Sequence, residues 1–127
     1  MNFILKNILE ILLCVFISII LFHIFIILKI IPYHIAWGGR LKNDVEMYVF
    51  EFISIFINVF ISWILVMKGN IVKCKFSDKT LNIILWIFFA IFILNTIANI
   101  FAQTIFEKTF AFLTGIIAIL LWKVLRK

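Results

Sequence analysis

Residues 7–28 read NILEILLCVFISIILFHIFIIL, a nearly unbroken apolar run whose acidic and basic side chains are Glu10 and His23. A helix of roughly 20 residues crosses the ~30 Å hydrocarbon core of a bilayer, so this run predicts a transmembrane helix. The run is longer than a typical signal-peptide core, and no small-residue cleavage site follows it before Pro32. We therefore expect the segment to remain as the first span.

Three more apolar runs follow, with the charged residues falling between them, at residues 48–67, 81–102 and 110–125. Backbone groups in lipid must be paired within the segment, which excludes an open sheet, and the runs lack the alternating polar residues of a β-barrel strand. The sequence predicts an all-α, four-helix transmembrane bundle that forms a single domain over residues 1–127.

The composition agrees with an integral membrane protein. Hydrophobic residues make up 66% of the 127 residues, aromatic residues 17% and charged residues only 14%, and the mean hydropathy is +1.26. A soluble domain does not tolerate this hydropathy, and a disordered chain lacks this aromatic content.

The distribution of basic residues predicts the orientation. In a four-span chain the N-terminus, the second loop and the C-terminus share one side of the membrane. Eight of the 12 Lys and Arg residues lie on that side: Lys6, Lys68, Lys73, Lys75, Lys79, Lys123, Arg126 and Lys127. The positive-inside rule then puts both termini in the cytoplasm.

The net charge of +6 and the pI near 9.6 are explained by anionic lipid headgroups, since the basic residues cluster at the ends of the spans. No soluble module exists to bind nucleic acid. Cys14 lies within the first span and Cys74 in the second loop, so both are expected to be free thiols. Because His23 and His34 stand apart from other ligand-type residues, we expect no metal, no cofactor and no catalytic set.

Polar residues inside the spans mark the candidate site. Glu51 begins a stripe on the second span that continues at intervals of three or four residues, and Asn95 and Asn99 lie one turn apart on the third. With a helical rise of about 1.5 Å per residue, His23, Glu51 and these asparagines lie about 5–11 Å outward of the bilayer centre. Their shared level predicts one outward-opening pocket, although interhelical hydrogen bonding alone would also explain Asn and Ser residues.

The loop after the first span adds Trp37 and Arg40 to the candidate ligand-binding residues. Gly38 and Gly39 permit a close backbone approach, so the loop can fold over the pocket and pair Arg40 with Glu51, Glu46 or Glu107. Glu107, just before the fourth span, is a further candidate ligand-binding residue. The alternative is a tight turn anchored at the interface by Trp37.

The run Ala36-Trp37-Gly38-Gly39-Arg40, the segment from Asn95 to Asn99 and the pair Glu107-Lys108 resemble a family of small bacterial four-span proteins of unknown function. The resemblance covers nearly the whole chain. It implies a multi-pass protein of the bacterial cytoplasmic membrane and brings no activity with it. Pro32 is the single proline, whereas the family commonly has prolines after the loop and in the last helix.

Small residues on the fourth span, Ala111, Gly115 and Ala118, share one face that permits close helix approach. They can form a dimer face, but a bundle of this size needs such a seam itself, which favours packing within the chain.

Three functional hypotheses follow. The first is a binding or transport module for a small polar or lipid-like ligand, with Glu51 as a buried, unpaired acid. The second is an interaction protein, such as an immunity factor or accessory subunit, in which Glu51 is paired with Arg40 and no pocket is needed. The third is an enzyme that uses the outer His, Glu and Arg side chains for acid–base chemistry.

Overall fold

The computed structural model describes residues 3–32, 42–73, 76–101 and 105–126. Over these ranges it forms four helices and no strand: α1 (Phe3–Ile27), α2 (Asp44–Lys68), α3 (Asp78–Ile100) and α4 (Ile105–Arg126). All four are long and apolar enough to cross a membrane. The prediction of an all-α chain with four candidate spans is confirmed.

Two helices begin before their apolar runs because polar residues cap them. The side chain of Asn43 accepts a hydrogen bond from the backbone N–H of Glu46 at 2.9 Å and starts α2 at Asp44. Ser77 accepts from the N–H of Thr80 at 3.2 Å and starts α3. Acidic residues in these first turns also interact favourably with the helix dipole. The apolar runs predicted the membrane segments, and the caps extend the helices beyond them.

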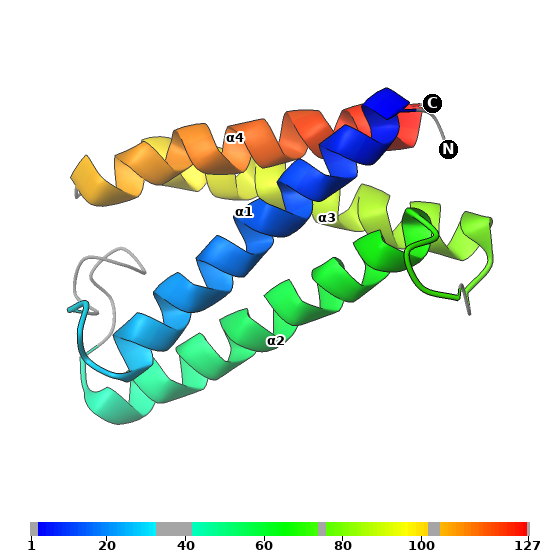
Figure 1. Ribbon diagram of the computed structural model, residues 1–127. Helices are drawn as coiled ribbons and strands as arrows, with labels where there is room; N and C mark the ends of the chain where they lie inside the picture. The colour runs from blue at the N-terminus through cyan, green and yellow to red at the C-terminus, as the bar shows by residue number, and fades with distance from the viewer. Residues whose placement is uncertain (1–2, 33–41, 74–75, 102–104, 127) are drawn as a thin grey trace.

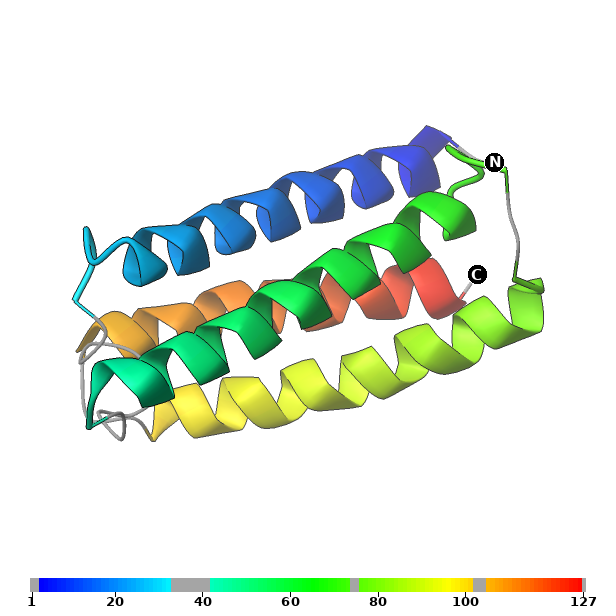
Figure 2. The same ribbon diagram turned by 90° about the horizontal axis from the view of Figure 1, so that it is seen from below.

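The helices form two hairpins, α1 with α2 and α3 with α4 (Figures 1 and 2). The first turn of α1 and the last turn of α4 lie at the same end of the bundle, which we call the terminal end; the opposite end, where α2 and α4 begin, is the far end. Figure 1 shows the two hairpins close together at the terminal end and diverging toward the far end.

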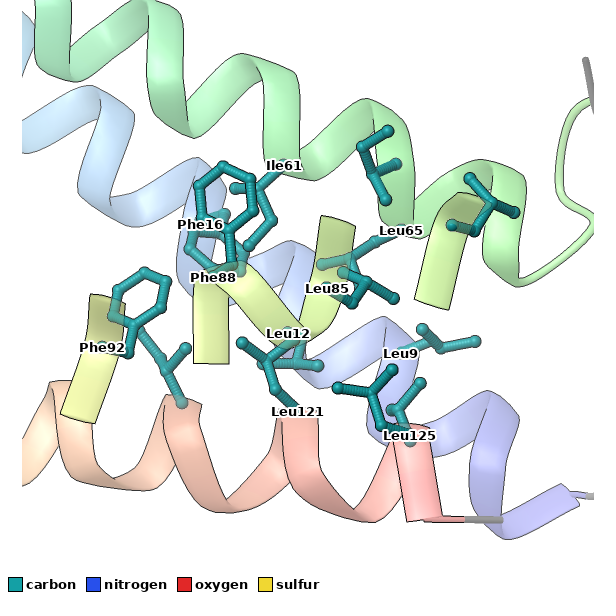
Figure 3. Packing of buried hydrophobic residues seen from close by; sticks show 14 of the residues in the cluster. Leu9, Leu12, Phe16, Ile61, Leu65, Leu85, Phe88, Phe92, Leu121 and Leu125 are labelled. Atoms are coloured by element: carbon teal, nitrogen blue, oxygen red, sulfur yellow. The ribbon is translucent and has the colours of Figure 1, made fainter. Parts of the chain in front are cut away.

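The main apolar core fills the terminal half of the bundle. Leu12 and Phe16 of α1 meet side chains from all three other helices (Figure 3). The fully or almost fully buried members of this cluster include Leu9, Leu12, Phe16, Ile61, Leu65, Leu85 and Leu121. Interlocking of these side chains joins the two hairpins, since helices in lipid associate through close packing.

The far half holds a smaller apolar cluster, formed by Ile26 of α1 and Met47 of α2. Both residues belong to the first hairpin, and Phe22, which packs against them, also contacts Phe110 of α4. Among the described residues the larger apolar cluster therefore lies in the terminal half and the smaller one in the far half.

The small residues of α4 pack inside the chain. Ala118 is fully buried in the main core. A Cβ added at Gly115 would lie 3.7 Å from the Thr96 methyl group of α3, an ordinary contact distance. Gly115 and Ala118 therefore lie inside the bundle, while the choice between a dimer face and packing within the chain stays a prediction for the set as a whole.

Adjacent residues on α1 provide a test of the core. Leu12 is fully buried, whereas Ile11 is 51% exposed on the lipid side. Leu12→Ala leaves a cavity among four helices and is expected to lower the free energy of unfolding by about 2–5 kcal/mol. Ile11→Ala should change it by no more than about 0.5 kcal/mol. Reversible unfolding in mixed detergent micelles measures both, and equal losses would contradict the packing described here.

Candidate functional site

Buried polar side chains gather in the far half of the bundle. Glu51 is fully buried, Glu107 is 6% exposed, and Ser54 and Thr114 are also buried. Each lies between the middle of its helix and the far end. The described residues thus divide along the bundle axis into an apolar terminal half and a far half that contains the buried polar groups.

His23 and Glu51 form the centre of this polar half. Nδ1 of His23 on α1 is hydrogen-bonded to Oε2 of Glu51 on α2. The His23 side chain is 14% exposed and the Glu51 side chain is fully buried. The two residues are far apart in sequence, and the antiparallel packing of the first hairpin brings them to the same level.

The chemistry of this pair follows from its surroundings. An isolated carboxylate is costly to bury in a medium of low dielectric, so a buried Glu requires a hydrogen-bond donor or a counter-charge. His23 supplies either one, as a neutral imidazole that donates its ring N–H or as an imidazolium. An imidazolium beside a carboxylate has no net charge, and neither has an imidazole beside a carboxylic acid. A proton can therefore move from one group to the other without changing the net charge of the pair.

Aromatic rings surround the pair and bridge the two hairpins. The ring of Phe22 lies edge-on to that of His23, with centroids 5.5 Å apart. The same ring meets Phe110 of α4 at 5.3 Å. Nearer the middle of the bundle, Phe16 contacts Phe92 of α3 at 5.7 Å. Phe22 therefore links the His23 side chain to the second hairpin through Phe110.

The rest of the polar stripe on α2 is bonded to its own helix. The side-chain N–H of Asn58 donates to the backbone carbonyl of Ser54 at 2.7 Å, and the hydroxyl of Ser62 donates to the carbonyl of Asn58 at 2.8 Å. Asn58 and Ser62 are therefore satisfied locally. Their role in the described structure is structural, and Glu51 is the member of the stripe that reaches another helix.

A pair of hydroxyl groups joins α3 and α4 at a similar level along the bundle. The Thr96 hydroxyl of α3 donates to the Thr114 hydroxyl of α4 at 2.9 Å, and the Thr114 hydroxyl also bonds the carbonyl of Phe110. Our sequence interpretation missed both threonines. Their signal was weak because a hydroxyl that bonds its own helix carries little cost in a span.

The other predicted site residues are placed as follows. Glu107 is buried near the start of α4, Asn99 is half-buried, and Asn95 is exposed on the surface of α3. The structure brings His23 and Glu51 together and does not bring Asn95 into the interior with them. Trp37 and Arg40 lie outside the described residues.

One expectation about Glu51 is wrong. The hypothesis of a ligand-binding module expected a buried and unpaired acid. Glu51 is buried, but it is paired with His23. The acid had no basic residue one turn away on its own helix, and its partner comes from the neighbouring helix.

His23 and Glu51 have atoms of the kind that bind metals, but the described residues contain no group of three His, Cys, Asp or Glu side chains placed to hold a metal ion.

Comparison of the chain with known protein families, with curated proteins and with solved structures found no match. The resemblance based on the loop from Ala36 to Arg40 stays a prediction.

A double-mutant cycle tests the coupling between His23 and Glu51. Each single replacement by Leu leaves a polar partner in the bundle interior, whereas the double replacement removes both. We expect a coupling free energy of about 1–3 kcal/mol in micelle unfolding. The control is the pair Lys29 and Asp44, whose side chains are 55% and 48% exposed and whose coupling should stay below about 1 kcal/mol. A His23–Glu51 coupling no larger than the control would contradict the buried pair.

Proposed function

We propose that the protein is a membrane binding or transport module that takes a small polar or lipid-like ligand in the far half of the bundle, beside His23 and Glu51. The observation that carries this proposal is the concentration of the buried polar side chains in that half, away from the main apolar core. Ionisable residues kept inside a span are costly and commonly mark a ligand, ion or proton pathway.

The arrangement of the hairpins supports the same proposal. The main core joins all four helices in the terminal half, while the hairpins diverge toward the far end (Figure 1). In the far half the two hairpins can therefore move relative to each other without breaking the main core. The rings of Phe22 and Phe110 contact each other between the hairpins, so such a movement would alter this contact.

The chemistry of the site defines the ligand class. His23 and Glu51 together offer a donor and an acceptor, and the half-buried Asn99 of α3 supplies a carboxamide in the same half. A ligand with both hydrogen-bonding and apolar parts matches these groups and the adjacent phenylalanine rings. Because the pair offers both a donor and an acceptor, it can bond a ligand group of either kind.

The orientation of the site in the membrane is also proposed here from the distribution of charge. The terminal end of the described chain carries Lys6, Lys68, Lys73, Lys79, Lys123 and Arg126. The positive-inside rule then favours cytoplasmic termini and a far end that opens away from the cytoplasm of a bacterial cell.

A second candidate is favoured by the pairing of Glu51. An interaction or accessory protein of the membrane needs no ligand site, and it would use the His23–Glu51 bond only to fix the first hairpin. In that case the far half is dry, and the lipid-facing helix surfaces carry the function.

Cysteine accessibility distinguishes the two candidates. In a background with Cys14→Ser and Cys74→Ser, single cysteines replace Ser54, which is buried, and Asn99, which is half-buried. Their controls are Phe56→Cys and Ile97→Cys on the same helices, at residues that are 73% and 49% exposed to the lipid side. The probe is a charged methanethiosulfonate that cannot cross the membrane, added from the side of the far end.

A polar binding site admits water, and a thiol ionises and reacts only where water reaches it. We expect Ser54→Cys and Asn99→Cys to react at least about tenfold faster than their lipid-facing controls. Equal, slow labelling of all four folded variants would overturn the binding module and favour the interaction protein. Reaction only from the opposite side would contradict the proposed orientation.

A further inference from the structure

Positive charge at the terminal end of the bundle is only partly matched by acids. Lys29 forms an ion pair with Asp44 at 2.5 Å at the far end, and Lys68 forms one with Asp78 at 3.0 Å at the terminal end. Glu10 is the other acid in the terminal half, where the described chain has five more cations: Lys6, Lys73, Lys79, Lys123 and Arg126. None of the ion pairs between described residues includes these five. The terminal end therefore keeps an excess of positive charge.

Arg126 differs from the other four cations because its side chain has a defined contact. The guanidinium carbon Cζ lies over the ring of Trp122, one turn earlier on α4, at 4.6 Å from the ring centroid. This is a cation–π contact. Arg126 is exposed and Trp122 is 38% exposed, so both are accessible from outside the bundle. A ring face is not a hydrogen-bond acceptor of the ordinary kind, and the N–H donors of Arg126 remain available to an anion.

The pair lies at the level where a helix leaves the membrane. Trp122 is four residues from the end of α4, or about 6 Å along the helix axis. Tryptophan is enriched at the membrane–water interface, and long basic side chains extend to the same level from helix ends. Lys123 is three residues before Arg126, so the two side chains are neighbours on the helix surface. We call Trp122, Lys123 and Arg126 the α4 basic patch.

The dipole of α4 does not balance this patch. The C-terminal end of a helix carries roughly −0.5 of an elementary charge, whereas Lys123 and Arg126 carry two positive charges, which leaves roughly +1.5. Asp78, the acid that the terminal end offers besides Glu10, is already bonded to Lys68. An anion from outside the chain is therefore needed to match the patch.

We propose that the α4 basic patch binds the phosphate headgroup of one anionic phospholipid. A phosphate accepts two parallel N–H bonds from a guanidinium, and Lys123 adds a second positive charge. Because Arg126 covers the ring of Trp122, a choline headgroup meets a cation there instead of an open aromatic face. The patch thus favours a headgroup with net negative charge over a zwitterionic one.

The surface of α4 next to the patch suits the acyl chains of the same lipid. Phe112, Ile116 and Ile119 precede Lys123 and Arg126 at intervals of three and four residues, so all five share one side of the helix. The three apolar side chains are 78%, 50% and 56% exposed. One face of α4 therefore has the two parts of a phospholipid in order, apolar toward the middle of the bundle and cationic at the end.

This site is independent of the proposed ligand site, which lies in the opposite half of the bundle. It also differs from the general attraction of basic residues to a negative membrane surface. General attraction depends on the number of charges near the membrane. A bound phosphate depends in addition on the planar donors of Arg126, so a lysine at this position is a poor substitute.

Quenching of Trp122 fluorescence measures which lipid touches the patch. The full-length protein with Trp37→Phe, Trp63→Phe and Trp86→Phe keeps Trp122 as its tryptophan. It is reconstituted in equal amounts of phosphatidylglycerol and phosphatidylcholine, with bromine on the acyl chains of one lipid at a time. We expect the occupancy of phosphatidylglycerol next to Trp122 to exceed that of phosphatidylcholine about threefold or more.

Two variants of this protein separate a site from general attraction. Arg126→Lys keeps the charge and loses the planar donors, so it should lower the preference for phosphatidylglycerol at least about twofold. Lys79→Gln removes one charge of the same end from α3, at an exposed residue, and should leave the preference unchanged. Full preference in Arg126→Lys, or an equal loss in Lys79→Gln, would overturn the proposal. Circular dichroism verifies that each variant keeps its helices.

A second reporter and a competitor complete the test. Trp63 is five residues from the end of α2 and 41% exposed, and a protein with Trp63 as its tryptophan should show a smaller preference. An equal preference at Trp63 would mean general attraction and would contradict the site. Inorganic phosphate, compared with chloride at equal ionic strength, should leave the quenching at Trp122 unchanged because the acyl chains hold the lipid. Displacement by phosphate would assign the patch to a free anion and overturn the lipid.

Discussion

Close packing in the terminal half of the bundle is the constraint on which the rest of the structure depends. Lipid is as apolar as a leucine side chain, so helices in a membrane gain little by hiding apolar surface from one another. They are held by interlocking shapes and by hydrogen bonds. Leu12, Phe16 and Leu121 supply the interlocking shapes that join both hairpins. Because this packing holds the hairpins together, the far half can contain polar groups that pack less closely than apolar side chains.

The His23–Glu51 pair is one such set of groups, and its burial costs free energy. A buried ion pair seldom stabilises a fold more than apolar residues of the same size would, since both groups lose their hydration. A bundle selected for stability alone would do as well with leucines at these two positions. The proposed ligand site would account for a His and a Glu at these positions, whereas Asn58 and Ser62 bond to carbonyl groups of their own helix.

The sequence was sufficient to predict the four helices, because apolar runs of this length have few alternatives in lipid. Burial of Glu51 also followed from the stripe on its helix. The partner did not, since depth along a span says nothing about rotation around its axis, and the bond joins two residues that are 28 apart in sequence. The same limit explains Asn95, which has the expected depth but an exposed side chain.

The two unusual features of α1 have separate positions. His23 lies in the far half and bonds inward to α2, whereas Glu10 and Cys14 lie in the terminal half and face outward. The bond of His23 therefore lies outside the part of α1 that packs in the main core. The polar pair can change its hydrogen bonding while Leu12 and Phe16 keep their places in that core, so one helix can hold the bundle together and carry the polar site.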